Sequence, residues 1–154
     1  MKGVVTMKLD EYKKAVAPSE EEEQRRIFVW AEHLRNKYPA LDLLYHIPNE
    51  GKRSASAGAR LKAIGMRSGV PDLCLPHSEM DYHALYIELK TSRGRLTFNQ
   101  AQWLRALSGA GNLALVCHRA DEAIIVLMAY CNNDENTIKD FLQSTAKEVS
   151  GTDA

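Results

Sequence analysis

The stretch VPDLCLPHSEMDYHALYIELK (70–90) decides the fold of this 154-residue chain. Two apolar runs, 71–76 and 83–90, flank a polar connection, and the second run alternates between apolar and polar residues. This pattern predicts two strands joined as a hairpin. Since alternate side chains of a strand share a face, Glu88 and Lys90 lie side by side with an apolar face behind them.

The charges of this hairpin indicate a chemistry. An alternating strand usually carries only a weak, exposed ion pair on its polar face. Asp72 changes that interpretation, because hairpin pairing brings its carboxylate beside Glu88. Two adjacent carboxylates repel unless a cation neutralises them, and Mg²⁺ or Mn²⁺ accepts one or two carboxylates, waters and phosphate oxygens. We therefore expect these acids to bind the metal while Lys90 holds or deprotonates the water that attacks a phosphodiester.

Helical and strand patterns alternate along the rest of the chain. They predict a helix from Ser19 to Pro39, a strand at 41–47, a helix at 57–66, a helix opening at Thr97, a strand at 112–118, and helices at 121–130 and 135–147. We expect one α/β domain at 19–148, with a mixed β-sheet flanked by helices, an N-terminal arm at 1–18 and a flexible tail at 149–154.

Basic residues are concentrated in two segments, although Lys+Arg and Asp+Glu both number 20. Segments 52–67 and 90–105 contain nine of the basic residues and no acid. Because both flank the proposed catalytic strands, we expect a local positive face that binds nucleic-acid phosphates. Its expected contacts are His46, Asn49, Lys52, Arg53, Arg60, Lys62, Arg67, Arg93 and Arg95.

Other patterns bear on location and cofactors. Three cysteines without CxxC spacing indicate reduced thiols, and neither a signal-peptide core nor a 20-residue apolar span is present, so we expect a cytoplasmic protein with no membrane partner. GAGNLA (109–114) follows a helix instead of opening one, and GKRS (51–54) lacks the first glycine of a phosphate-binding loop. We expect no nucleotide cofactor.

Five motifs stand in a recognisable order: EEQ (22–24), PNEGKR (48–53), GVPD (69–72), ELK (88–90) and GRLTFNQ (94–100). This set resembles the virus-type replication-repair nuclease (VRR-NUC) family of the PD-(D/E)xK superfamily, over about residues 20–130. The resemblance implies a restriction-endonuclease-like core, with Asp72, Glu88 and the backbone carbonyl of Leu89 holding the metal and Lys90 serving the water.

Two further site residues follow from the resemblance, and each has an alternative role. Glu22 would be an additional acidic member that reaches the site from the first helix, and Gln100 would stand beside the catalytic lysine. However, Glu22 lies three residues after Ser19, and Gln100 three residues after Thr97, which is the spacing of a capping box. Both roles stay open for Glu22, and a site-supporting role is favoured for Gln100.

The resemblance implies an Mg²⁺- or Mn²⁺-dependent endodeoxyribonuclease that cuts branched DNA, such as Holliday junctions or flaps, in bacterial or phage replication and repair. Since nothing in the chain resembles a separate recognition domain, we expect a homodimer whose two sites cut paired strands. Two alternatives remain open: a sequence-specific restriction-type endonuclease, and a catalytically silent DNA-binding module.

Overall fold

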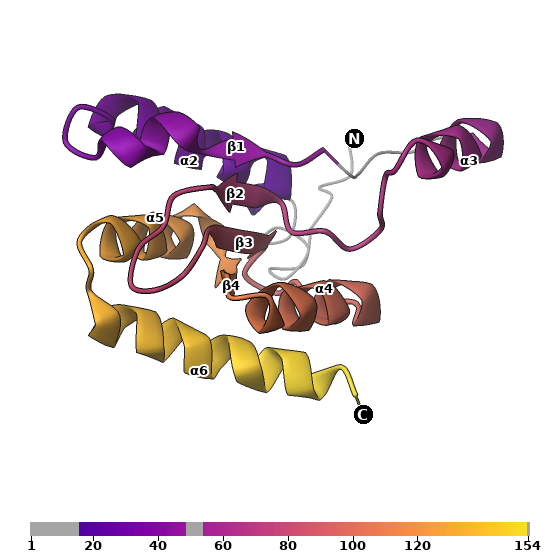
Figure 1. Ribbon diagram of the computed structural model, residues 1–154. Helices are drawn as coiled ribbons and strands as arrows, with labels where there is room; N and C mark the ends of the chain where they lie inside the picture. The colour runs from indigo at the N-terminus through magenta and orange to yellow at the C-terminus, as the bar shows by residue number, and fades with distance from the viewer. Residues whose placement is uncertain (1–15, 49–53, 154) are drawn as a thin grey trace, which may run out of the picture.

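A four-stranded mixed sheet forms the centre of the molecule, a computed structural model that describes residues 16–48 and 54–153 (Figure 1). In spatial order the strands are β1 (Tyr45–His46), β2 (Leu73–Leu75), β3 (Leu85–Lys90) and β4 (Leu113–His118). β1, β2 and β3 pair antiparallel, whereas β3 and β4 pair parallel. The predicted α/β class, mixed sheet and hairpin are confirmed.

Four helices cover the two faces of the sheet: α2 (Glu20–Leu34), α4 (Phe98–Gly109), α5 (Arg119–Cys131) and α6 (Glu135–Gly151). The described chain also contains α3 (Ala55–Ala63) and a 3-10 helix η1 at Pro39–Leu43. Ile27 of α2 and Leu127 of α5 pack with Ile87 of β3 in the main core. Leu104 of α4 packs with Val116 of β4 in a second core on the opposite face. β3 is therefore enclosed on both sides.

This enclosure determines the environment of the hairpin charges. Leu85, Ile87 and Leu89 belong to the main core, as their alternation predicts. Glu88 and Lys90 are also buried, with 1% and 7% of their surface exposed. The ordinary interpretation of a solvated polar face therefore does not hold, because α4 and α6 cover the face that an isolated hairpin would leave in water.

Two stretches differ from the sequence-based expectation. Segment 41–47 is not one strand: Pro39 begins η1, where its fixed φ is favourable, and β1 is confined to Tyr45–His46 at the sheet edge. The last helix continues past the expected start of the tail at 149. Val149 is buried, and Arg105 donates to its carbonyl and pairs with Asp153, so tertiary contacts hold this end in place.

α3 is the exception to this compact arrangement. It contains no buried residue and projects away from the sheet and its covering helices (Figure 1). Of the expected arm, only residues 16–18 lie within the described residues. Within 16–48 and 54–153, no helix combines the length and apolar character needed to cross a bilayer.

Candidate active site

The hairpin brings Asp72 to Glu88 across two neighbouring strands. β2 and β3 pair Leu73 with Ile87, so the next position outward sets Asp72 opposite Glu88. The Asp72 carboxylate Oδ2 accepts a hydrogen bond from the Leu89 N–H at 2.8 Å, and Asp72 is only 7% exposed. The first acid is therefore fixed against the backbone of the strand that carries the second.

Glu88 is held by a cation and an amide. Its Oε1 lies 3.3 Å from Lys90 Nζ and accepts a hydrogen bond from Gln100 Nε2 at 2.7 Å. Gln100 Oε1 in turn accepts from the Thr97 N–H at 2.9 Å and completes the capping box of α4. The two ends of the Gln100 amide thus make different contacts, since the oxygen caps α4 and the nitrogen binds Glu88.

A glycine turn carries the chain from α3 to Asp72. Gly69 has φ +88°, and a Cβ there would lie 2.7 Å from the backbone carbon of Asn99, so only glycine lets the turn lie against α4. Trp103 Nε1 donates to the Ser68 carbonyl at 2.9 Å and anchors the same turn. The packing of the turn thus requires Gly69 of the GVPD motif (69–72), three residues before Asp72.

His46 supports Asp72 from the edge strand. The carbonyl of Asp72 accepts hydrogen bonds from the Ile47 N–H at 2.7 Å and from His46 Nδ1 at 3.1 Å. Because a carbonyl can only accept, Nδ1 carries the hydrogen in this hydrogen bond. The sequence-based expectation assigned His46 to phosphate contacts, and the structure adds this bond to the backbone of Asp72.

A cavity of about 180 Å³ opens beside these residues. It is lined by Glu20, Glu21, Gln24, His46, Pro48, Asp72 and Leu89. Glu20 and Gln24 lie four residues apart on α2 and therefore share a helix face. The N-terminal part of α2 thus brings two glutamates and the amide of Gln24 to the cavity that contains Asp72.

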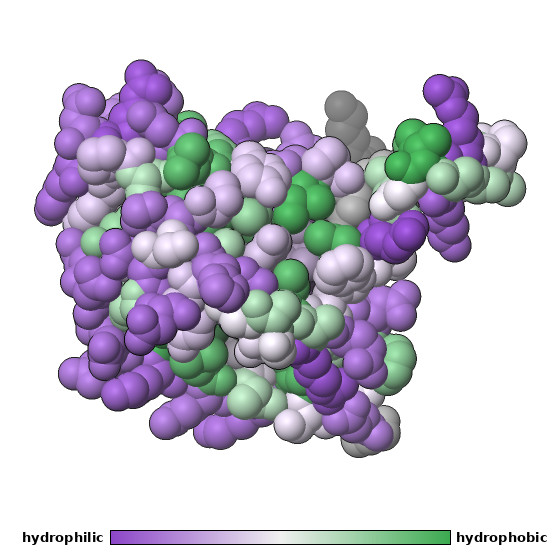
Figure 2. Space-filling view, viewed as in Figure 1, coloured by the Kyte–Doolittle hydropathy of each residue, from purple (hydrophilic) through white to green (hydrophobic). Residues whose placement is uncertain are grey.

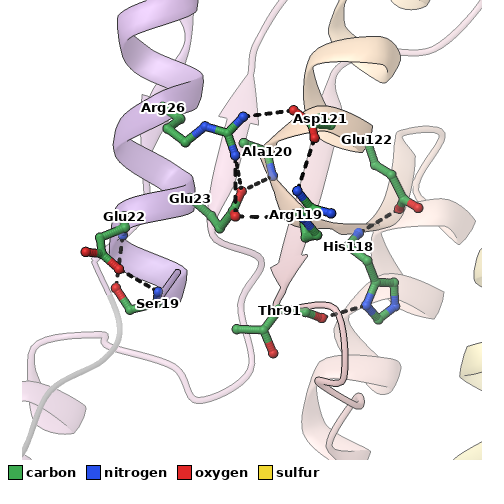
Figure 3. Close-up of polar contacts among 10 residues, drawn as sticks. All are labelled: Ser19, Glu22, Glu23, Arg26, Thr91, His118, Arg119, Ala120, Asp121 and Glu122. Carbon is green, nitrogen blue, oxygen red and sulfur yellow. Dashed lines mark hydrogen bonds and ion pairs between the residues drawn. The ribbon is translucent and has the colours of Figure 1, made fainter. Parts of the chain in front are cut away.

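The structure does not bring Glu22 to this cavity. Glu22 Oε2 accepts a hydrogen bond from the Ser19 N–H at 2.7 Å, and Ser19 Oγ accepts from the Glu22 N–H at 3.2 Å (Figure 3). These hydrogen bonds hold the pKa of Glu22 below its usual value. Its place is the capping box, whereas Glu20 and Glu21 of the Glu run line the cavity with Gln24, and the carboxylate of Glu21 pairs with Arg25 at 3.0 Å. The missed signal was the four-residue spacing of Glu20 and Gln24.

Glu23, the next residue, fixes α2 against α5. Its side chain is 1% exposed and accepts from the Ala120 N–H at 2.5 Å, at the start of α5. Arg26 pairs with the same carboxylate at 3.2 Å, and Arg119 approaches it at 3.9 Å (Figure 3). This buried contact sets the rotation of α2, and with it the face that carries Glu20. Sequence analysis did not identify this role.

His118 ties the end of β3 to the last helix. It stands opposite Lys90 in the parallel pairing, and its Nδ1 donates to the Thr91 carbonyl at 2.8 Å. Its Nε2 lies 3.0 Å from Glu148. Burial lowers the pKa of His118, but the hydrogen bonds to Thr91 and Glu148 and the charges of Glu148 and Glu122 outweigh it, so the net pKa is raised. The residue after Lys90 is thereby held in place.

The expected nucleic-acid contacts lie mainly on the surface. Arg60, Lys62 and Arg67 are exposed on α3 and after it, and Arg93 and Arg95 are exposed between β3 and α4. Asn49, Lys52 and Arg53 lie outside the described residues.

The donor set fits a hard divalent ion. Asp72 and Glu88 offer carboxylate oxygens, and Leu89 lines the same cavity and has a backbone carbonyl to offer. In the described parts of the chain, no three His, Cys, Asp or Glu side chains lie close enough to hold a metal by themselves. Such a set suits Mg²⁺ or Mn²⁺, which keep water and phosphate oxygens as ligands, and does not suit zinc.

The chain was compared with known families, curated proteins and solved structures. The family model described as VRR-NUC domain matches residues 10–121. A solved structure titled VRR_NUC domain protein is similar, with 27% identity and a TM-score of 0.65, over 75% of this chain and 90% of that one. No curated protein matches the chain.

Proposed function

This chain belongs to the VRR-NUC domain family, a nuclease family, and from that premise we propose that it is a metal-dependent endonuclease acting on branched DNA. The observation that supports this most is the buried group at the end of β3, where Glu88 is bound by Lys90 and Gln100 and faces Asp72 across the hairpin. Burying charges is costly, and sites that place charges in such surroundings are usually functional.

The proposed roles follow from these positions. Asp72, Glu88 and the Leu89 carbonyl would hold Mg²⁺ or Mn²⁺, which supplies Lewis acidity at the phosphate and lowers the pKa of bound water. Lys90 Nζ orients the attacking water and offsets the charge that develops on the phosphate. Gln100 keeps Glu88 in place and is a positioning residue.

Glu20 and Gln24 extend the proposed site from α2. Both line the cavity beside Asp72, so they take the place that sequence analysis gave to Glu22. An acid and an amide here can bind water or a further cation. Arg93 and Arg95 from the β3–α4 connection, and the basic residues near α3, bind phosphates on either side of the scissile one.

The test is cleavage of a panel of labelled DNAs: a four-way junction, a flap and a linear duplex, each with Mg²⁺ and with EDTA. We expect Mg²⁺-dependent cutting of the branched substrates, lost in Asp72→Asn and kept in Asp42→Asn, a matched change of an exposed acid on η1. Equal cutting of junction and duplex would contradict the preference for branches. Cutting of the duplex at one fixed sequence would favour the restriction-type alternative.

Light scattering tests the proposed assembly. A homodimer would bring two such sites to one junction, which a chain of this size needs in order to cut paired strands. A monomer in solution that stays a monomer on junction DNA would contradict this part of the proposal and leave the nuclease assignment in place.

A further inference from the structure

Within residues 16–48 and 54–153, α3 is a helix that buries none of its residues. Ser54 caps it, accepting from the Ala57 N–H, so the local sequence specifies the helix. None of its residues is buried, and it extends beyond the rest of the described molecule (Figure 1). Helices in proteins are usually stabilised by packing an apolar face against the core. Such packing does not account for α3, which is exposed to solvent.

The C-terminal end of α3 exposes an isoleucine. Ile64, the C-cap residue, is 73% exposed, the highest value among the exposed large hydrophobic residues of the described chain. Gly65 follows with φ +106°, and the Met66 N–H returns to the Leu61 carbonyl at 2.9 Å. This glycine-based closing turn ends the helix directly after Ile64.

The surroundings of Ile64 are basic. Arg60, Lys62 and Arg67 are exposed around it, and the sequence has no acid from residue 52 to 67. Figure 2 shows strongly hydrophobic and strongly hydrophilic residues next to each other on this projecting part. A single exposed isoleucine is ordinary on a protein surface. However, Ile64 stands at the end of a helix whose charged residues are all basic, and such a surface is complementary to a polyanion that also has apolar parts. DNA has both, in its phosphates and its base faces.

We propose that Ile64 is an apolar wedge that inserts beside the unpaired or distorted bases of a DNA branch point while Arg60 and Lys62 bind the flanking phosphates. Aliphatic side chains that enter the base stack must overcome the stacking of neighbouring bases, and this cost is smaller where stacking is already broken. The wedge therefore favours branched over linear DNA. This inference rests on the proposed function and assigns a residue to its substrate preference.

The wedge is connected to the site by an anchored turn. From Ile64 the chain passes through Ser68 and Gly69, which are fixed on α4 by Trp103 and Asn99, to Asp72. The base of the projection is thus held beside the metal-binding acids, so a branch point engaged by Ile64 lies in a defined relation to the cleavage site.

The test uses the full chain with Ile64→Ser, and with Ile125→Ser as the matched control, because Ile125 is a 43%-exposed isoleucine on α5. Binding is measured by fluorescence anisotropy in EDTA on a four-way junction, a flap and a linear duplex. A second set of junctions carries 2-aminopurine at the branch point, whose fluorescence rises when it is unstacked.

We expect Ile64→Ser to weaken binding to the junction by about five- to tenfold and to the duplex by less than about twofold. The 2-aminopurine signal should rise with the wild type and with Ile125→Ser, and stay low with Ile64→Ser. Equal affinities for all three proteins, or an unchanged 2-aminopurine signal, would overturn the wedge. Light scattering that shows the variant losing a dimer would overturn it as well, because Ile64 would then belong to a contact between copies.

These outcomes separate the two proposals. If the wild type cuts branched DNA and Ile64→Ser retains the same preference for it, the wedge alone fails. If the wild type neither binds nor cuts any of the DNAs, the proposed function fails, and the wedge with it.

Discussion

The end of the hairpin and the projecting helix α3 place charged residues in opposite environments: the hairpin buries them, and α3 exposes them to solvent. At the hairpin, Asp72, Glu88, Lys90 and Gln100 are each 9% exposed or less and are bound to one another or to the backbone. On α3 no residue is buried, and the basic side chains face solvent. Groups that act on one bond benefit from a fixed geometry, whereas groups that meet a long polyanion benefit from reach.

Removing the positive charge of Lys90 from the buried end of the hairpin should have the largest effect on DNA cleavage. Lys90→Ala is expected to lower the rate of DNA cleavage by about 10²- to 10⁴-fold, since it removes the group that orients the water, while DNA affinity stays near that of the wild type. Lys139→Ala, at an exposed lysine of α6, is the control and should cleave normally. A Lys90→Ala protein as active as the wild type would contradict the role of Lys90.

The two capping boxes, one with Gln100 and the other with Glu22, allow two opposite substitutions to be compared. Gln100→Glu retains an oxygen that can accept from Thr97, but it removes the amide that donates to Glu88 and adds a negative charge beside it. A hydrogen bond to a charged group is worth about 1.5–3 kcal/mol, so we expect cleavage to fall by about 10- to 100-fold with the helix cap kept. Glu22→Gln, the opposite exchange in a box away from the cavity, should leave cleavage unchanged. Equal effects of the two would show that Gln100 acts only as a cap.

A smaller effect distinguishes the carboxylates at the start of α2. Glu20 lines the cavity with Asp72, and Glu22 does not. Glu20→Gln is expected to lower kcat/KM on junction DNA by about tenfold, with the melting temperature little changed. Loss of cleavage in Glu22→Gln and normal cleavage in Glu20→Gln would restore the assignment made from the sequence.

The smallest expected effect concerns pH and the support behind Lys90. Because folding raises the pKa of His118, its contribution to stability is complete below the ordinary histidine pKa of about 6.5 and is lost as the pH rises through the higher value of the folded state. His118→Asn should therefore destabilise the protein more at pH 5.5 than at pH 8.5 in urea unfolding. A pH-independent difference for His118→Asn would contradict this account.

The sequence predicts those features of the fold that depend on residues close together in the chain. Alternation in β3, capping by Ser19 and Thr97, and the hairpin all follow from neighbouring residues, and each is present in the structure. The burial of Glu88 was not predictable in this way, because it depends on α4 covering a face that a hairpin alone exposes.

The choice between Glu20 and Glu22 shows the same limit. Four consecutive glutamates satisfy either register, and only the docking of α2 through buried Glu23 selects which of them faces Asp72. Segment 41–47 was misjudged for a related reason: its apolar residues suit a strand, but Pro39 begins a 3-10 turn and the edge position leaves only two residues paired.

The central claim is that Asp72 and Glu88 hold one divalent ion at the end of the hairpin. A crystal soaked in Mn²⁺ and measured at the manganese absorption edge tests it without any assay of activity. We predict an anomalous peak about 2.0–2.3 Å from oxygens of both carboxylates and of the Leu89 carbonyl. A fully soaked crystal with no peak between these residues, or with its peak elsewhere on the chain, would contradict the claim.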